Sequence, residues 1–379
     1  MLGPLDTDLV RHHLVDPPPL PPGTGAPSVS LLVDGLVRAG HHVTMWTLDP
    51  RVTEPVVAEG PSLRIWYGRQ PARHRGRTLH REERAALVAG MQGAEVDVLH
   101  AHWTYEYAWA ALGRPEPLLV TARDWPPAIM RLQASPYRAF RMVAAARVFA
   151  ARPAMTAPSE YLAAKHRRIG LPTTVIPNGI PAASVVAQAR DRGEGMDVLS
   201  VASGFDNRKN TRSLLRSHAL LRRGGLDARL VMIGAGHGPG EQAERWAREH
   251  DVHAGVEFRG QIPYPDVLEA MQRSALLVHP SREESYGRVL VEAMAKALPV
   301  IGGQRSGAVP WVLDGGQAGV LVDVESPEAI AAATASVLTD DSRWTHLSRV
   351  GRDRAATAFT MEPIVGQYVD RYQALIAGA

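Results

Sequence analysis

The sequence contains no cysteine, which excludes disulfide bonds, thiolate-ligated metal sites and cysteine nucleophiles. It also lacks any apolar run of the roughly 20 residues that a membrane-spanning helix needs. The first ten residues, MLGPLDTDLV, carry acid and proline where a secretory leader has positive charge followed by an apolar stretch. These absences lead us to expect a soluble, cytoplasmic protein.

Neither sign of charge is in large excess: the sequence has 42 basic and 39 acidic residues, a net charge of +3. A charge this small and dispersed predicts no nucleic-acid partner. Only three basic residues are lysines, namely Lys165, Lys209 and Lys296. Residues 64–84 hold seven arginines against two acids. This stretch is either the solvated face of a loop and helix or a surface for peripheral membrane contact or a phosphate-bearing acceptor.

The 379 residues, 45% of them apolar, suffice for two domains. Short apolar runs ending in small or polar residues alternate with helical periodicity, a pattern typical of parallel α/β sheets. The pattern pauses over residues 183–195, where we expect a linker. We therefore predict two doubly wound domains, residues 1–182 and 196–355, followed by a helix over residues 356–379. Ligands of such sheets lie at the carboxyl ends of the strands, and two facing sheets would enclose a cleft.

The segment HPSREESYGRVLVEAMAKALPVIGG joins a buried strand to a helix through a polar loop. Glu284 lies on that loop, and Glu292 follows in the second helical turn with seven residues between them. The backbone N–H groups left free at the helix start belong to Tyr286, Gly287 and Arg288. Such groups suit a phosphate, whereas carboxylates accept hydrogen bonds from hydroxyl groups. A nucleotide-sugar, with its phosphate centre and polyol ends, fits this chemistry.

This segment resembles the signature of the family 4 retaining glycosyltransferases, which have the GT-B fold of two Rossmann-like domains facing across a cleft. The resemblance implies that Glu284 contacts the hydroxyls of the donor sugar. It also implies that the backbone of Ser285 to Arg288 meets the diphosphate and that Glu292 holds the ribose hydroxyls. In this fold the C-terminal helix, residues 356–379, is expected to return to the N-terminal domain.

The stretch VLSVASGFDNRKNTRSLL resembles the first strand and loop of the family's donor domain. Lys209 falls where the family has a lysine at the donor diphosphate, and a cation there would stabilise charge on the leaving group. The family's nearby arginine is replaced by Ser203, so Arg208 either substitutes for it or faces solvent. The later strand VEFRGQIP would place Gly260 and Ile262 near the nucleotide base.

The stretch VDVLHAHW resembles the family's segment before the acceptor site. By that resemblance His102 contacts the donor sugar near the reacting centre, while His100 shares its face or lies deeper. Arg123 stands where the family often has histidine, which indicates an anionic or otherwise unusual acceptor. Trp103 opens an aromatic stretch, expected to be partly helical, that either stacks on sugar rings or packs in the core. The glycine-rich loop that resembles the family's acceptor-side loop comprises Gly23, Thr24 and Gly25.

Two other enzyme classes fit less well. A dinucleotide-binding dehydrogenase would use RLVMIGAGHGPG, but after Gly234 and Gly236 the third glycine position holds Pro239. A metal-dependent GT-A glycosyltransferase needs Asp-x-Asp after a strand, and the match at residues 6–8 lies in a terminus that we expect to be disordered. We therefore expect no required metal, and no cofactor beyond a nucleotide-sugar co-substrate.

The sequence thus predicts a retaining glycosyltransferase that moves a sugar from a UDP-linked donor to a hydroxyl of a glycan or natural product. By the resemblance its catalytic groups are His102, Glu284 and Lys209, and retention follows from front-face substitution. Trp311 occupies the position of a family glutamate. Two alternatives stay open: a membrane-surface enzyme with a lipid-linked acceptor, and a non-catalytic nucleotide-sugar-binding protein.

Overall fold

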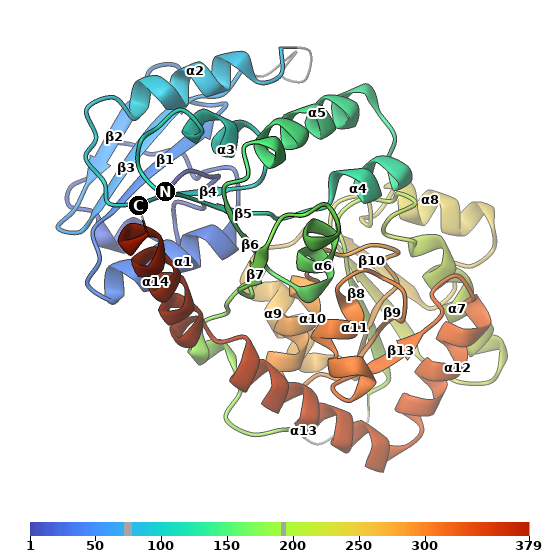
Figure 1. Cartoon of the computed structure of the whole chain (residues 1–379). Helices are drawn as coiled ribbons and strands as arrows, with labels where there is room; N and C mark the ends of the chain where they lie inside the picture. The colour runs from blue at the N-terminus through green and yellow to red at the C-terminus, as the bar shows by residue number, and fades with distance from the viewer. Residues whose placement is uncertain (72–77, 191–194, 379) are drawn as a thin grey trace. The chain divides into compact units, whose positions relative to one another are not determined.

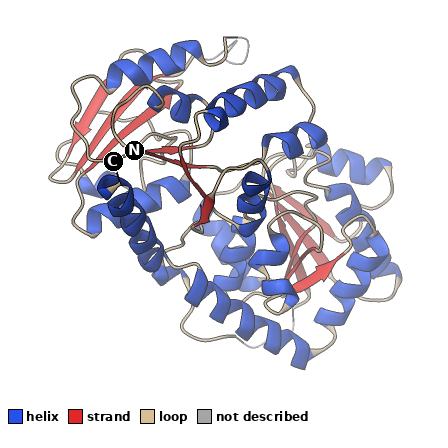
Figure 2. Cartoon of the chain, viewed as in Figure 1, coloured by secondary structure: helices blue, strands red, loops and turns tan. Residues whose placement is uncertain are grey.

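A computed structural model describes the chain except for residues 72–77, 191–194 and 379 (Figure 1). The chain forms two compact units: one comprises Met1–Pro181 and Met361–Ala379, and the other comprises Ala182–Thr360. Helices flank the strands of each unit (Figure 2). None of the described helices is long and apolar enough to cross a membrane.

The expected linker over residues 183–195 runs into one of the gaps, because residues 191–194 lie outside the described part of the chain. Its described residues before the gap belong to the second unit. There the backbone N–H of Val186 donates to the carbonyl of Ala295 over 2.9 Å. The guanidinium of Arg190 likewise donates to backbone carbonyls at the end of a helix of that unit. These bonds hold the start of the expected linker against the second unit.

Parallel strands dominate the first unit, in two hydrogen-bonded groups with the orders β1-β3-β2 and β4-β5-β6-β7. The strands are β1 (Val43–Asp49), β2 (Val56–Glu59), β3 (Leu63–Arg69), β4 (Leu99–His102), β5 (Leu118–Thr121), β6 (Ala154–Ala157) and β7 (Thr173–Val175). Only β2 runs antiparallel to its neighbour, β3. Leu2 forms bridges to Trp46 of β1 and to Ala101 of β4, and so joins the two groups.

The expectation of a disordered N-terminus is wrong. Leu2, Leu5 and Val10 are fully buried, and the hydroxyl of Thr7 donates to the carbonyl of Pro21 over 2.7 Å. The apolar side chains at the start of the chain have a core to enter, and their burial offsets the entropy lost on ordering the segment. The Asp-x-Asp match at residues 6–8 therefore lies in an ordered loop beside the glycine-rich loop, where Asp6 bridges Gly23.

The arginine-rich stretch over residues 64–84 is only partly the loop and helix face considered above. Residues Arg64 to Arg69 lie in β3, which pairs with β1 and in which the exposed Arg64 lies between the buried Leu63 and Ile65. That alternation is the period of a strand with one face packed on a core. The stretch ends in a helix that begins at Arg81, and residues 72–77 lie outside the described part.

The helices of the first unit are α1 (Pro27–Arg38), α2 (Arg81–Gly90), α3 (Glu106–Ala111), α4 (Pro126–Leu132), α5 (Pro136–Ala150), α6 (Glu160–Arg168) and α14 (Met361–Ala377), with a 3-10 turn η1 (Arg11–His13). Helix α14 lies beside α1 although the two are far apart in sequence (Figure 1). A Cβ on Gly35 of α1 would come within 2.5 Å of Val365, so glycine permits this approach. The aromatic stretch that was expected to be partly helical starts before α3, since Trp103 and Tyr105 precede it.

The second unit is built on one parallel sheet of order β10-β9-β8-β11-β12-β13. Its strands are β8 (Asp197–Val201), β9 (Arg229–Ile233), β10 (Val256–Gly260), β11 (Leu276–His279), β12 (Val300–Gly303) and β13 (Val320–Val322). Its helices are α7 (Thr211–Arg223), α8 (Gln242–Glu249), α9 (Tyr264–Arg273), α10 (Arg288–Ala295), α11 (Val309–Val312), α12 (Pro327–Leu338) and α13 (Asp341–Ala358), with 3-10 turns η2 (Ala182–Ser184) and η3 (Asp314–Gly316). The central strands are almost wholly apolar because helices cover both faces of a parallel sheet.

Candidate active site

A cavity of about 320 Å³ lies in the second unit at the carboxyl ends of β8, β9 and β11. Doubly wound sheets bind ligands at this edge. Strand ends, the loop after β8, the loop after β10 and the start of α10 all contribute to the cavity. The polar and charged side chains in its lining are Ser203, Lys209, Gln261, His279, Glu284 and Arg288.

Glu284 is the centre of the charge network in this cavity. Its Oε1 accepts hydrogen bonds from Lys209 Nζ at 2.6 Å and from His279 Nε2 at 3.0 Å. The guanidinium of Arg208 lies 3.9 Å from the same oxygen. Burial by itself raises the pKa of Glu284, but Lys209, His279 and Arg208 outweigh it and hold that pKa well below its ordinary value. The carboxylate is therefore ionised, and cations surround it on one side.

The loop that carries Glu284 is held by a close backbone approach. Gly307 has φ +63°, and a Cβ there would lie 2.3 Å from the carbonyl oxygen of Glu284. The backbone N–H of Ala308 donates to that carbonyl over 2.8 Å. Only glycine combines this φ with this contact at low cost, so Gly307 fixes the depth at which Glu284 sits.

The start of α10 faces the cavity through Gly287, Arg288 and Val289. Gly287 adopts φ +85° as the N-cap residue and accepts the backbone N–H of Leu290 at 2.9 Å. The first amides of a helix have no partner inside it, and together they present partial positive charge. This end of the cavity therefore suits an anionic group.

Glu292, expected to bind ribose, already has partners within the protein. Its Oε1 accepts the hydroxyl of Tyr264 at 2.8 Å and Nε of Arg288 at 2.6 Å. Burial, and then the charge of Glu292, raises the pKa of the Tyr264 hydroxyl to about 12. Of these three side chains Arg288 lines the cavity, and Glu292 orients it.

The structure separates the expected donor residues into two groups. Lys209, Ile262, Glu284, Gly287 and Arg288 line the cavity itself. The others lie behind it or adjacent to it: Arg208, Gly260, Ser285, Tyr286 and Glu292. They belong to the loops, the helix and the strand β10 that carry or precede the lining residues.

Trp311 and Tyr286 pack against a common partner. Tyr286 lies 6.5 Å from Trp311 between ring centroids, and both rings lie 5.9 Å from that of Phe359, which is fully buried. Edge-on aromatic contacts of this kind stabilise a core. Trp311, which departs from the family pattern, thus helps to fix the loop after Glu284.

In the first unit His102 ends β4 and is fully buried. A guanidinium nitrogen of Arg123 lies 2.9 Å from its Nδ1, and Arg123 also donates to Oδ1 of Asn178. Nε2 of His102 is buried with no hydrogen-bond partner in the described residues. Burial, followed by the charges of His100 and Arg123, lowers the pKa of His102 well below its ordinary value. The imidazole is therefore neutral.

His100 has a different environment from His102. Its Nδ1 hydrogen-bonds with the hydroxyl of Tyr372 and its Nε2 with that of Thr121, each over 2.7 Å. Its ring packs 5.2 Å from that of Tyr368. Both ring nitrogens are thus used inside the first unit, and His100 connects β4 to α14.

The remaining acceptor-side candidates lie on loops. Arg51 donates to the carbonyl of Gly23 at 2.5 Å, at the start of the glycine-rich loop that continues with Thr24 and Gly25. A Cβ on Gly23 would clash with the carbonyl of Leu5, so this glycine has a structural role. Trp103 follows β4 with φ +67°, and the guanidinium of Arg123 lies 5.9 Å from its ring.

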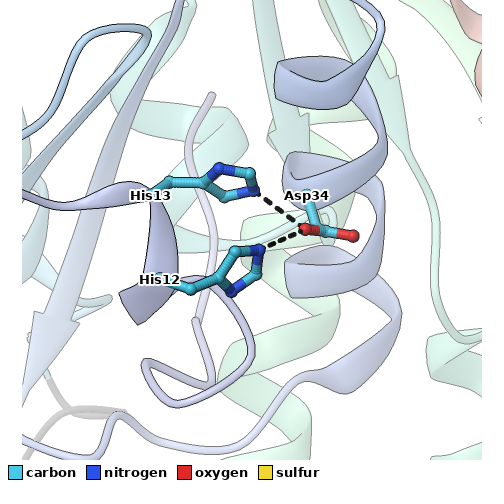
Figure 3. Close-up of side chains that lie close together, drawn as sticks. All are labelled: His12, His13 and Asp34. Carbon is cyan, nitrogen blue, oxygen red and sulfur yellow. Dashed lines mark hydrogen bonds and ion pairs between the residues drawn. The ribbon is translucent and has the colours of Figure 1, made fainter.

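His12, His13 and Asp34 form a separate cluster (Figure 3). Nε2 of His13 and of His12 lie 2.8 and 3.0 Å from Oδ1 of Asp34. Arg38 also donates to this carboxylate, at 2.9 Å to the same oxygen. Asp34 therefore already has a cationic partner, and its hydrogen bonds explain the cluster without a metal ion.

The comparisons with known proteins agree with this architecture. A family model for group 1 glycosyl transferases matches residues 188–354, and one for Glycosyltransferase Family 4 matches residues 26–184. Together the two models match most of the chain. The chain belongs to glycosyltransferase family 4.

This family 4 glycosyltransferase is 31% identical over 134 residues to a D-inositol 3-phosphate glycosyltransferase of Corynebacterium kroppenstedtii. That alignment covers 34% of this chain and 30% of the relative. The chain is also 28% identical over 209 residues to a glycogen synthase of Mycobacterium tuberculosis. That alignment covers 54% of this chain and 49% of the relative. The aligned regions thus span less than half the length of these relatives.

Solved structures resemble the whole family 4 chain. A sucrose-phosphate synthase from Thermosynechococcus elongatus has a TM-score of 0.79 at 23% identity, with 94% of each chain covered. The Anabaena protein HepE in complex with UDP and glucose has a TM-score of 0.68 at 18% identity, with 92% of this chain and 96% of that chain covered. These likenesses establish the GT-B fold, so the prediction of two Rossmann-like domains is confirmed.

Sequence reasoning assigned no role to His279, which the structure places against Glu284. The available signal was its position, because a polar residue that ends a buried strand points into the ligand edge of an α/β sheet. Tyr264 was missed as well, and no local pattern connects it to Glu292, 28 residues away.

Proposed function

We propose that the chain transfers a sugar, with retention of configuration, from a nucleoside diphosphate, preferentially UDP, to a hydroxyl group. The observation that supports this best is the pairing of Lys209 with Glu284 at 2.6 Å beside the start of α10. A cation and a helix N-terminus suit a diphosphate, and a carboxylate next to them suits sugar hydroxyls. The Anabaena structure with UDP and glucose supports UDP as the first donor to test.

Each group has one task in this proposal. The amides at the start of α10 and the ammonium of Lys209 bind the diphosphate and stabilise its charge as the bond to the sugar breaks. Glu284 accepts hydrogen bonds from the sugar hydroxyls. Arg288, oriented by Glu292, faces the nucleoside end together with Ile262. In the first unit, His102 supplies a hydrogen-bond donor, and Gly23, Trp103 and Arg123 make up the proposed acceptor site.

Retention in this site requires no covalent intermediate. Glu284 is paired with the ammonium group of Lys209 and hydrogen-bonded to His279, which makes it a poor nucleophile. The acceptor oxygen forms its bond to the anomeric carbon on the face from which the diphosphate leaves. The bond from that carbon to the phosphate oxygen breaks, and the acceptor proton passes to that oxygen. The carboxylates bind, and the leaving group is the base.

The test is release of UDP or GDP from a panel of nucleotide-sugars, measured by mass spectrometry with and without EDTA. Glu284→Ala and Lys209→Ala should lower release about 100-fold, or about 2.7 kcal/mol of barrier. His218→Asn is the control, since that buried histidine of the same unit bonds the backbone carbonyl of Gly255. Proton NMR of the product then gives the anomeric configuration. Release that stops in EDTA, or an inverted product, contradicts the proposal.

A lipid-linked acceptor is the second candidate, and one surface favours it. Helix α5 has no acidic residue and carries the exposed Arg147, and its side chains Tyr137, Met142 and Val143 are 40%, 36% and 53% exposed. Apolar and basic side chains on one helix favour an anionic lipid surface. Flotation with vesicles of anionic phospholipid should carry the wild type upward, and Val143→Asp should reduce it. Absence of flotation contradicts this candidate.

A further inference from the structure

His279 lies at the carboxyl end of β11, where its side chain is 3% exposed and lines the cavity. Its Nε2 is 3.0 Å from Oε1 of Glu284. An ionised carboxylate only accepts hydrogen bonds, so Nε2 carries the proton of this contact. Its other nitrogen, Nδ1, has no partner in the described residues, so the bond to Glu284 is the polar contact that orients the ring.

The two donors to Glu284 reach the same oxygen from different elements. Lys209 comes from the loop just before α7, and His279 comes from the sheet. Both bond Oε1, and neither bonds Oε2. The carboxylate is thus held by one oxygen, and the other oxygen is available to a ligand.

The two donors are not equivalent once a diphosphate enters the cavity. Lys209 has a flexible side chain and a full positive charge, so a diphosphate competes with Glu284 for its ammonium group. The side chain of His279 is shorter than that of Lys209, it is buried, and it projects from the last residue of β11, so its position is fixed by the sheet. Of these two donors, His279 is then the one that keeps the carboxylate of Glu284 in place.

We propose that His279 is a positioning residue for the donor sugar: its Nε2–H holds Oε1 of Glu284, so that Oε2 receives a sugar hydroxyl. The inference rests on the proposed function, since it concerns the donor sugar of that same site. It predicts that His279 affects recognition of the sugar and leaves recognition of the nucleoside diphosphate unchanged.

The test compares two ligands and two substitutions. Calorimetry gives the affinities for UDP and for the UDP-sugar that the donor screen selects, or UDP-glucose if none is turned over. His279→Leu should weaken UDP-sugar binding and lower kcat/KM about tenfold, the loss expected for a hydrogen bond to a charged group, while the affinity for UDP stays within about twofold. His279→Gln, whose amide can donate to Glu284, should recover most of the loss. A merely structural role would weaken both ligands in parallel and would overturn the inference, as would no change in either.

A second readout does not depend on turnover. Carbon-13 NMR of labelled glutamate, assigned with Glu284→Gln, follows the titration of Glu284 directly. The pKa of Glu284 should rise in His279→Leu, because one donor to its charged form is lost. It should not change in His218→Leu, the matched change at a buried histidine with a backbone partner. If wild type turns over no donor and this pKa still rises, the proposed function fails while the contact of His279 with Glu284 stands; an unchanged pKa overturns the inference.

Discussion

The guanidinium of Arg123 lies 2.9 Å from Nδ1 of His102, at the carboxyl ends of two neighbouring strands. An arginine only donates hydrogen bonds, so Nδ1 is the acceptor and the proton of the neutral ring sits on Nε2. His102 is thereby prepared as a hydrogen-bond donor and cannot act as a base through either nitrogen. Arg123, which departs from the family pattern, thus orients the proton of His102, which follows that pattern.

Replacing Arg123 tests this relationship. Arg123→Met removes the donor to Nδ1, so the tautomer is no longer imposed and the turnover of the nucleotide-sugar should fall about tenfold. Long-range nitrogen–proton NMR of His102 should show a shift from one tautomer to a mixture. Arg147→Met, a change at an exposed arginine of α5, is the control. An unchanged His102 spectrum in Arg123→Met would show that the tautomer has another origin.

Lys209→Ala should make the melting temperature of the protein depend less on acid pH. The pKa of Glu284 in the folded state lies below its ordinary value of 4.5, so its charged form contributes stability that is lost as pH falls through the folded pKa. Burial raises the pKa of Glu284 and the nearby cations lower it, so that pKa rises when Lys209 is removed. The melting temperature of the variant should therefore be lower than that of wild type at neutral pH, and it should fall less than that of wild type as the pH drops below 4.5. Coincident pH profiles would argue against control of Glu284 by Lys209.

Glu292→Gln should separate ribose binding from the orientation of Arg288. If Glu292 binds ribose hydroxyls, wild type should prefer UDP to 2′-deoxy-UDP by about tenfold, and the variant should lose this preference. If Glu292 only orients Arg288, the variant should weaken both nucleotides equally. Calorimetry with the two nucleotides distinguishes the cases, and Tyr264→Phe, which removes another partner of Glu292, is the companion variant.

Tyr372→Phe should destabilise the first unit without a direct effect on chemistry. It removes the partner of Nδ1 of His100, a buried bond of 2.7 Å. The expected loss is about 1–3 kcal/mol, which lowers the melting temperature by several degrees. Tyr368→Phe is the matched control, since the hydroxyl of Tyr368 lies 3.4 Å from that of Thr121 and should contribute less. An equal loss in both variants would mean that the hydroxyl contacts are not the cause.

Several features of the fold and of the candidate site could be predicted from patterns within short segments of the sequence. The alternation of apolar runs with helical periodicity predicted α/β units, because each period reports which face of a segment is buried. Glu284, Lys209 and the glycine at the start of α10 were found because their neighbours in sequence form the strand, loop and helix that carry them. Such signals are local, and no distant residue is needed to recognise them.

Other features lay beyond any local pattern. The order of residues 1–10 depends on β1 and β4, which complete the sheet around Leu2. The contact of Glu292 with Tyr264 depends on the packing of α9 beside α10, and the contact of Arg123 with Asn178 spans 55 residues. Sequence alone determined two α/β units, because burial periodicity and residue type are properties of short segments, and for the same reason it predicted a site for phosphate and hydroxyl groups. Only the tertiary structure decided that His279 bonds Glu284 and that Arg123 bonds His102, because these partners approach through sheets and loops whose geometry is set by the whole unit.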